Sequence, residues 1–170
     1  SAKPENVQQI KNNLNRINTT AKVIEAGSPV FCAQGEKITG KRVLVVEDGP
    51  TLTHGGMEFG AGTLAARQYG AKEIIDPRPW LKGTLIETFD KYSEIGNLLP
   101  AMGYGKQQIK DLEQTINDSD CDCVVIGTPI DLTRVINIQK PSVRVTYDLE
   151  EIGTPNLEMV LKSFLNQEKE

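Results

Sequence analysis

An apolar strand runs directly into a glycine-rich loop in the segment Lys41-Arg42-Val43-Leu44-Val45-Val46-Glu47-Asp48-Gly49-Pro50-Thr51-Leu52-Thr53-His54-Gly55-Gly56-Met57-Glu58-Phe59-Gly60-Ala61-Gly62. Loops in ordinary α/β units are about 2–6 residues long, and longer ones are usually functional or disordered. This loop carries its own apolar residues, and a helix is expected to begin near Thr63, which argues against disorder. Glycine lets backbone N–H groups approach an anion, and threonine hydroxyls add donors. The loop therefore predicts a site for a phosphate or a carboxylate.

Strand and helix patterns alternate on both sides of this segment. We expect strands at 21–26, 43–46, 73–75, 123–127 and 143–147, and helices at 4–18, 63–69, 84–92, 106–117 and from Thr154 onward. Glycine and proline punctuate residues 98–105, so a loop is expected there. Such alternation predicts an α/β fold, a Rossmann-like three-layer sandwich with a predominantly parallel sheet. Segments 42–46, 123–127 and 143–147 should share that sheet.

Composition and charge limit the class of protein. The net charge of −4 and the pI near 5.2 argue against a non-specific nucleic-acid binder, which is usually basic. No apolar run approaches the roughly 20 residues of a membrane helix. Three cysteines without a disulfide-scaffold spacing predict a reduced, cytoplasmic protein. Cys121 and Cys123 have no Cys/His partner pair elsewhere, so we interpret them as structural thiols and predict no metal site.

Three loops should meet at one edge of the sheet, because ligands bind outside the carboxyl ends of parallel strands. They span residues 47–62, 76–83 and 128–131. The candidate substrate- or phosphate-binding residues in them are Asp48, Gly49, Thr51, Thr53, His54, Gly55, Gly56, Arg78, Lys82, Thr128 and Asp131. We expect the first two loops to face one cleft, with the side chain of His54 directed into it. Cations and N–H donors at one edge suit a small, multiply anionic molecule such as a phosphorylated metabolite.

Each of these residues also has a simpler interpretation. Asp131 fits an ordinary N-cap of the helix that follows it. Arg78 and Lys82 could be solvated surface charges. His54 could bond to the backbone of a turn. The sequence contains neither a Gly-x-x-x-x-Gly-Lys-Ser/Thr phosphate loop nor a Gly-x-Gly-x-x-Gly after a strand, so this chain by itself is a poor candidate for an NTPase and predicts no bound cofactor.

Four segments resemble the C-terminal part of a known family. They are 40–57 (Gly-Lys-Arg-Val-Leu-Val-Val-Glu-Asp-Gly-Pro-Thr-Leu-Thr-His-Gly-Gly-Met), 75–79 (Ile-Asp-Pro-Arg-Pro), 99–105 (Leu-Pro-Ala-Met-Gly-Tyr-Gly) and 124–132 (Val-Val-Ile-Gly-Thr-Pro-Ile-Asp-Leu). The family is that of the predicted P-loop GTPases related to cyclic 2,3-diphosphoglycerate synthetase, and the resemblance extends over nearly the whole chain. It implies a prokaryotic, largely archaeal, multidomain enzyme in which an NTP-binding domain precedes this region.

The resemblance also implies a domain plan. Residues 1–30 would be the last helix and strand of an upstream P-loop NTPase domain, 31–40 a linker, and 41–170 an α/β C-terminal domain. Gly27 and Ser28 would lie where such domains close over the nucleotide base. ATP or GTP with Mg²⁺ would bind to the upstream domain. In isolation, residues 1–29 should pack less integrally than the rest, dock loosely, exchange between chains or form a homodimer.

Three functions follow as alternatives. The first is the substrate-side domain of an ATP- or GTP-dependent phosphoryl-transfer enzyme, in which Arg78, Lys82 and His54 position a small phosphorylated anion. The second is a regulatory or interaction module of a GTPase. The third is a nucleotide- or metabolite-binding domain without catalysis.

Overall fold

The chain divides into two compact units in the computed structural model, which describes residues 2–53 and 57–167. Unit 1 consists of Ser1–Pro29 together with Asp148–Glu170, and unit 2 consists of Val30–Tyr147. The two ends of the chain therefore belong to the same unit. The domain boundaries expected from the sequence placed residues 148–170 with the main domain, and the structure instead groups them with the N-terminal segment. That residues 1–30 belong to an upstream NTPase domain stays a prediction.

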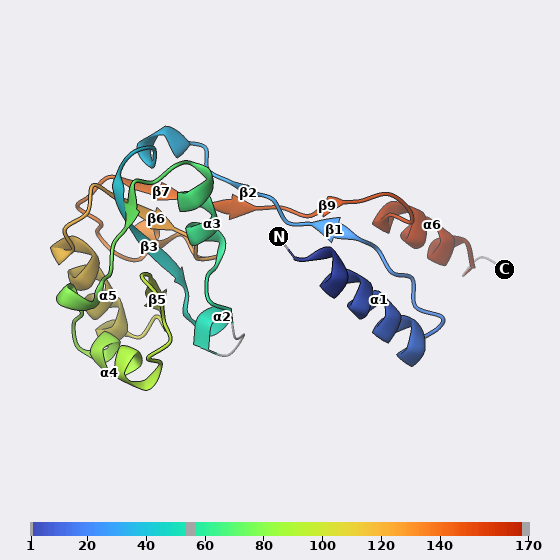
Figure 1. Cartoon of the computed structure of the whole chain (residues 1–170), viewed down its shortest axis with the longest axis horizontal. Helices are drawn as coiled ribbons and strands as arrows, with labels where there is room; N and C mark the ends of the chain where they lie inside the picture. The colour runs from blue at the N-terminus through green and yellow to red at the C-terminus, as the bar shows by residue number, and fades with distance from the viewer. Residues whose placement is uncertain (1, 54–56, 168–170) are drawn as a thin grey trace. The chain divides into compact units, whose positions relative to one another are not determined.

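Unit 2 is an α/β structure (Figure 1). Its elements are β2 (Val30–Phe31), η1 (Gly35–Lys37), β3 (Arg42–Asp48), α2 (Gly49–Thr53), α3 (Ala61–Gln68), β4 (Glu73–Ile74), η2 (Arg78–Trp80), α4 (Thr84–Lys91), β5 (Leu99–Ala101), α5 (Lys106–Asp118), β6 (Cys123–Ile126), η3 (Leu132–Arg134), β7 (Ser142–Arg144) and β8 (Thr146–Tyr147). Strands and helices alternate along most of this list. The order matches the α/β class predicted from the sequence.

The central sheet of unit 2 is parallel and is built around β3. On one side, β3 pairs with β6, which in turn pairs with β7. On the other side, two short strands share its length, with β4 beside Arg42 and Val43, and β5 beside the stretch from Val46 to Asp48. All four pairings are parallel, which confirms the predicted Rossmann-like sheet. The separate pair of β2 and β8 is antiparallel.

Helices cover both faces of this sheet. Figure 1 shows α3 on one side of β3 and β6, and α4 and α5 on the other. The residues Val43 to Val46 are completely buried, as are Val124 to Ile126 in β6. An uninterrupted apolar run is what a strand covered on both faces requires. The core of unit 2 therefore lies on the two strands whose patterns were clearest in the sequence.

Some elements differ from those expected. Residues 99–101, predicted to be in a loop, form β5. In the segment predicted as strand 21–26, only Ala26 belongs to a strand, β1 (Ala26–Gly27). The predicted strand 143–147 is divided between β7 and β8, which belong to different sheets. The last helix, α6, begins at Leu157 rather than next to Thr154, and the Asn156 side chain accepts a hydrogen bond from the Met159 amide.

Unit 1 contains two helices and one short ladder. Its elements are α1 (Pro4–Ile17), β1, β9 (Glu150–Glu151) and α6 (Leu157–Gln167). The ladder is antiparallel and pairs Ala26 with Glu151 and Gly27 with Glu150. Among the described residues of unit 1, none is buried. The helices therefore have no core of their own in this unit.

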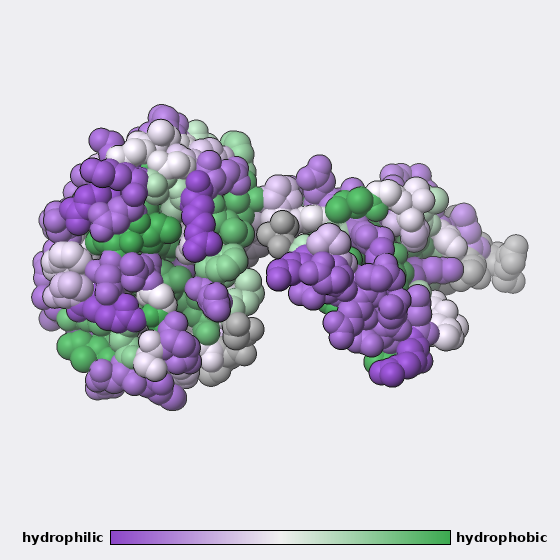
Figure 2. Space-filling view, in the orientation of Figure 1, coloured by the Kyte–Doolittle hydropathy of each residue, from purple (hydrophilic) through white to green (hydrophobic). Residues whose placement is uncertain are grey.

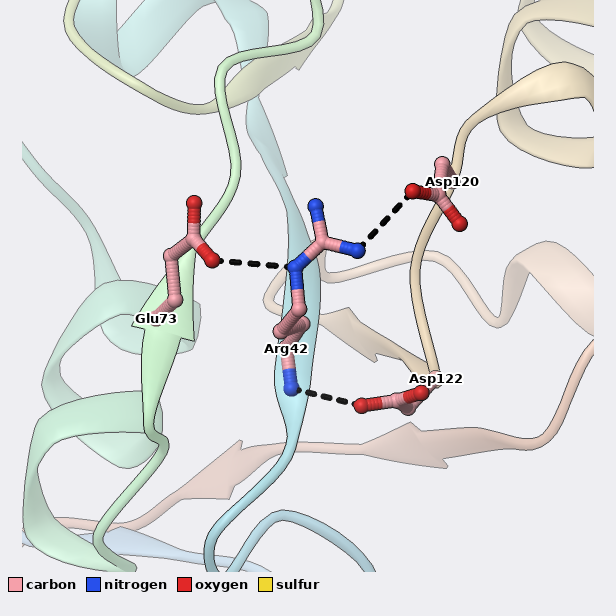
Figure 3. A network of polar contacts seen from close by, with 4 residues as sticks. All are labelled: Arg42, Glu73, Asp120 and Asp122. Atoms are coloured by element: carbon pink, nitrogen blue, oxygen red, sulfur yellow. Dashed lines mark hydrogen bonds and ion pairs between the residues drawn. The ribbon is translucent and has the colours of Figure 1, made fainter.

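One arginine links the amino ends of the parallel strands in unit 2 (Figure 3). The Arg42 guanidinium donates to Glu73 and to Asp120, each at 2.9 Å, and the Arg42 amide donates to Asp122 at 2.9 Å. The bond to Asp120, followed by that to Glu73, raises the pKa of Arg42, and the same contact lowers the pKa of Asp120. These exposed ion pairs join the starts of β3, β4 and β6 and lie at the edge opposite the predicted ligand site.

The start of α4 is capped by a side chain from α5. Asp111 is buried and accepts from the Thr84 amide and hydroxyl, each at 2.9 Å, and the Thr84 amide is the main reason that its pKa is lowered. A lowered pKa contributes stability that is present above the unfolded-state pKa and is lost as the pH falls through the folded-state pKa. We expect Asp111→Asn to cost about 1–2 kcal/mol at pH 7.

Urea unfolding between pH 7 and pH 3 measures this contribution. The difference between the parent and Asp111→Asn should shrink below about pH 4, where the carboxyl group of the unfolded chain is protonated. Asp90→Asn, an exposed change on the same helix α4, is the matched control. A difference that does not depend on pH would contradict the prediction.

No helix among the described residues is both long enough and apolar enough to cross a membrane.

Candidate functional site

The carboxyl ends of three strands meet at one edge of the sheet in unit 2. Val46 of β3 lies opposite Ile126 of β6, and Asp48 of β3 lies opposite Ala101 of β5. The loops that follow these strands consequently start side by side. In a parallel sheet this edge is the usual place for a ligand.

Glu47 is a buried carboxylate at this edge, with 1% of its surface exposed. One carboxylate oxygen, Oε1, accepts hydrogen bonds from the Gly60 amide at 3.1 Å, the Thr63 amide at 2.7 Å and the Thr63 hydroxyl at 2.9 Å. The other, Oε2, accepts from the Gly62 amide at 3.2 Å. Three backbone donors at the start of α3 and one hydroxyl are thereby satisfied by a single side chain. Glu47 caps α3 from the end of β3.

Glycines make room for this carboxylate. A methyl group at Gly60 would lie 2.5 Å from Glu47 Oε2, and one at Gly127 would lie 2.4 Å from the same atom. At Gly62 it would approach Val45 at 3.0 Å. The glycines of the loop thus serve a close contact with a side chain of the same protein. Gly127, from the end of β6, closes the cradle from the neighbouring strand.

This arrangement changes the interpretation of the glycine-rich loop. A helix N-terminus attracts anions through its free N–H groups and its dipole. The start of α3 does hold a carboxylate, as the loop predicted, but that carboxylate is Glu47. Burial raises the pKa of Glu47, and the four hydrogen bonds oppose that rise. The N–H groups of Gly60, Gly62 and Thr63 therefore already donate hydrogen bonds to Glu47.

Asp48 and α2 continue directly from β3 and are for the most part partly buried. The Asp48 carboxylate accepts from the Thr51 hydroxyl at 2.8 Å and from the Thr51 amide at 3.3 Å, and so caps this short helix. The Thr53 hydroxyl donates to the Gly49 carbonyl at 3.0 Å. Gly49 packs closely against β5, since a methyl group there would lie 2.7 Å from the Ala101 carbonyl oxygen. These four predicted residues lie together at the edge of the sheet.

Tyr104 joins this group from the loop after β5. Burial raises the pKa of its phenol, and the negative charge of Asp48 raises it further. The hydroxyl therefore stays protonated at neutral pH and remains a hydrogen-bond donor. Sequence reasoning missed Tyr104 because β5 itself was not expected. The Gly103-Tyr104-Gly105 pattern after Ala101 is the signal that could have pointed to it.

The loop after β6 carries the two other predicted residues of this edge. Thr128 is buried, and its hydroxyl donates to the Ile130 carbonyl at 2.6 Å. Asp131 accepts from the Thr133 amide at 3.2 Å and the Thr133 hydroxyl at 2.7 Å, and both bonds contribute to its lowered pKa. The simpler interpretation of Asp131 as an N-cap is confirmed, and the element that it caps is η3.

The guanidinium of Arg78 is positioned by contacts with neighbouring residues of unit 2. Its guanidinium lies 2.9 Å from Asp76, donates to the Ile95 carbonyl oxygen, and stacks over the ring of Phe89 at 4.9 Å from the centroid. The side chain is 39% exposed, so one part of it still faces solvent. These contacts fix the position of Arg78 between β4, α4 and the segment before β5.

Lys82 does not lie with the strand-end loops. Its ammonium pairs with Asp118 at 2.9 Å, and its backbone amide donates a hydrogen bond to the Thr115 hydroxyl of α5 at 3.1 Å. Asp118 is the last residue of α5, just before the chain enters β6 at its amino end. The expectation that Lys82 shares a cleft with the loop after β3 is therefore wrong. Turn η2 and the start of α4 direct it to the opposite edge.

The remaining predicted residues cannot be joined to this group. His54, Gly55 and Gly56 lie outside the described residues, so the predicted orientation of His54 stays a prediction. Gly27 belongs to β1 of unit 1, and Ser28, next to it, is exposed. Their assignment to a nucleotide base also stays a prediction.

A cavity of about 560 Å³ adjoins α2. The described residues that line it are Leu52, Thr53, Met57, Glu58, Phe59, Arg67, Glu94, Ile95, Gly96 and Leu98. The Arg67 guanidinium lies over the Phe59 ring, 5.1 Å from its centroid. Carboxylates and an aromatic ring thus stand beside an arginine within one cavity. The lining suits a small molecule that carries both apolar and cationic groups.

The chemistry of the edge follows from its hydrogen bonds. The hydroxyls of Thr51, Thr53 and Thr128 each donate to an oxygen of the protein, as described above. Their lone pairs and the Asp48 carboxylate remain able to accept. Apart from the Tyr104 hydroxyl, the described side chains of this edge therefore offer acceptors more readily than donors. They favour a ligand with N–H groups over a bare anion.

The three thiols of the chain are free and at least partly buried. Cys32 and Cys123 are buried and Cys121 is partly buried, all as free thiols. Burial raises the pKa of Cys123 to about 11 and also raises that of Cys121, in keeping with the structural role predicted for both. Within residues 2–53 and 57–167, no group of three or more His, Cys, Asp or Glu side chains could hold a metal ion.

Comparison with known proteins gives one informative match. The chain is 56% identical over 164 residues to arginine synthetase ArcE of Thermococcus kodakarensis. It is similar to an arginine synthetase. The match covers 96% of this chain but 37% of that protein, so the chain spans little more than a third of its length. No family model matches the chain, and no solved structure matches it. The resemblance to the cyclic 2,3-diphosphoglycerate synthetase family stays a prediction beside this match.

Proposed function

We propose that this chain corresponds to the C-terminal part of an ATP- or GTP-dependent ligase-type enzyme related to arginine synthetase. The observation that carries the proposal is the 56% identity across 96% of the chain. The family resemblance noted in the sequence points in the same direction, because it implies phosphoryl transfer driven by a nucleotide. In this proposal, the nucleotide and Mg²⁺ bind to another part of the enzyme.

Unit 2 would then supply the binding site for the substrate whose side chain carries, or receives, the nitrogen of the guanidinium group. The edge formed by Asp48, Thr51 and Tyr104 offers a carboxylate and hydroxyl oxygens, and the adjoining cavity adds Glu58 and Glu94. Carboxylates match the planar N–H pattern of a guanidinium group. The geometry thus supports arginine, or a precursor with a similar side chain, better than the phosphorylated anion predicted from the sequence.

Ligand binding to the 170-residue chain tests this proposal. Arginine, phosphorylated three-carbon acids and nucleotides should be compared by isothermal titration calorimetry. We expect arginine to bind, and Asp48→Asn to weaken binding about 10- to 100-fold, because a hydrogen bond to a charged group is worth about 1.5–3 kcal/mol. Asp118→Asn, at the opposite edge of the sheet, is the control and should leave the affinity unchanged.

Other outcomes would decide among the alternatives. Binding of phosphorylated acids that Arg78→Ala abolishes would favour the phosphorylated anion as ligand. Binding of nucleotides alone would favour a non-catalytic nucleotide-binding domain. No binding of any of the three would favour a regulatory or interaction module. Nucleotide-dependent formation of arginine by the intact enzyme, lost on Asp48→Asn, would extend the result from binding to activity.

A further inference from the structure

Apolar side chains are distributed very unevenly between the two units. Every buried apolar residue of the described chain lies between Cys32 and Val145, within unit 2. The exposed large apolar residues of unit 1 are Ile10, Leu14, Ile17, Leu149, Ile152, Leu157, Met159, Leu161, Phe164 and Leu165. Single exposed apolar residues are normal, but gathered ones mark an interaction surface. Unit 1 therefore carries a cluster of exposed apolar side chains.

On α1 the exposed residues form a stripe. Ile10, Leu14 and Ile17 follow one another at intervals of four and three residues, so they lie on the same face of the helix. Ile17 is 78% exposed and Ile10 is 59% exposed. Figure 2 shows mainly hydrophilic residues over the side of α1 that faces the viewer, the polar side of this amphipathic helix. The helix therefore has an apolar face without a described partner.

On α6 a second stripe has the same character. Leu157, Leu161, Phe164 and Leu165 are spaced for one helical face, and each is about half exposed. Beside them, Pro155, Met159, Val160, Ser163, Phe164 and Lys22 line a groove of about 370 Å³. The lining is mainly apolar. A folded surface with protruding apolar side chains would fill it.

The internal contacts of unit 1 leave the large apolar side chains of these helices exposed. Its ladder joins two residues of β1 to two of β9, and the Ile152 amide donates to the Glu25 carbonyl at 2.8 Å. The Leu157 amide donates to the Glu151 carboxylate, and Lys11 pairs with Glu25. An isolated two-stranded ladder is marginal in water. Most helical stability in proteins comes from packing of the apolar face.

We propose that the apolar faces of α1 and α6 form one docking surface for the part of an arginine synthetase-type enzyme that lies outside the matched region. The match includes 164 of the 170 residues of this chain and therefore nearly all of both helices, yet it covers 37% of the synthetase. The relative thus carries sequence that matches nearly all of both helices, together with a larger stretch of other polypeptide. This inference rests on the proposed function only for the choice of partner.

A linked domain of the same enzyme is a better occupant of this surface than a second copy of the chain. A covalently linked domain is present at an effective concentration in the millimolar range for short linkers. A second copy binds only in proportion to its concentration in solution, and it also loses translational freedom on binding. The linked domain therefore occupies an apolar face first. Homodimers formed through α1 and α6 are expected only where that domain is missing.

Hydrogen exchange measured by mass spectrometry tests the surface. The isolated chain is compared with a full-length chimera in which it replaces the matched region of the Thermococcus kodakarensis enzyme. We expect amides of α1 and α6 to exchange at least 100-fold more slowly in the chimera, with β3 equally protected in both. The double variant Leu161→Gln/Phe164→Gln should restore exchange at least tenfold, whereas Lys162→Gln on the polar face of α6 should not.

Two results would overturn the proposal. One is exchange of α1 and α6 that is as fast in the chimera as in the isolated chain while β3 remains protected. The other is an isolated chain that light scattering shows to be a dimer, with both helices already protected and unaffected by the added domain. The corresponding helices of the intact Thermococcus enzyme give a second measurement if the chimera does not fold. Neither measurement depends on ligand binding, so failure here is distinguishable from failure of the proposed function.

Discussion

Replacing Glu47 by alanine is expected to lower the free energy of unfolding of unit 2 by about 3–5 kcal/mol, because several donors lose their acceptor and each buried donor left without one costs about 1–3 kcal/mol. The change removes the acceptor of three amides and one hydroxyl at the start of α3. It also leaves a space at the end of the central strand. The effect should be among the largest of any single substitution in the chain, and chemical denaturation followed by circular dichroism measures it.

Glu73→Ala is the matched control for this prediction. Glu73 is also a glutamate in a strand of the same sheet, but it is about half exposed and pairs with Arg42 at the surface. Its loss should cost less than about 1 kcal/mol, as is typical for exposed ion pairs. Similar costs for the two variants would mean that the cap on α3 contributes little. Glu47→Gln should fall between them, because an amide keeps one oxygen acceptor but turns N–H groups toward other donors.

Gly127→Ala is expected to destabilise unit 2 by about 2–4 kcal/mol, at or above the usual cost of adding a methyl group to a packed interior. The added methyl would lie 2.4 Å from Glu47 Oε2 and 2.5 Å from the Gly62 amide nitrogen. The second contact is with backbone, which cannot rotate away. Either the start of α3 or the end of β6 must move, and the hydrogen bonds to Glu47 would lengthen.

Gly96→Ala separates this steric effect from the general effect of replacing glycine. A methyl group at Gly96 meets nothing within 4 Å, so its stability should change by less than about 1 kcal/mol. Thermal unfolding of the two variants side by side provides the comparison. Equal melting temperatures for Gly127→Ala and the parent would contradict the packing described around Glu47.

The fold was predictable where local pattern and burial agree. Strands β3 and β6 are uninterrupted apolar runs, and α5 shows its apolar positions at helical spacing, so each was expected close to its observed bounds. Strand β5 was missed because Pro100 lacks an N–H and counts against a strand. The structure tolerates Pro100 because β5 pairs with β3 alone and is therefore an edge strand. A proline in an edge strand leaves no neighbouring strand without a hydrogen-bond donor.

The candidate site was predictable only in part, for a related reason. Asp48, Gly49, Thr51 and Thr53 follow β3 directly, so the topology alone brings them to the carboxyl edge. The role of Glu47 depends on Gly127, which comes from another strand, and no local pattern links the two. Lys82 was placed at the wrong edge because the path of the chain through η2 to α5 depends on the Thr115 and Asp118 contacts rather than on its own sequence.

The order in which the strands are synthesised gives the sheet a particular folding problem. Strand β3 contains the most buried run of the chain, yet β6, which covers one of its edges, begins only at Cys123, and β7 ends at Arg144. A ribosome must therefore release the chain as far as β6 before the valine-rich strand acquires its neighbour on that edge. Until then, one edge of that strand is open to pairing with other nascent chains. A polypeptide that stops before Cys123 would keep this edge open permanently and should aggregate.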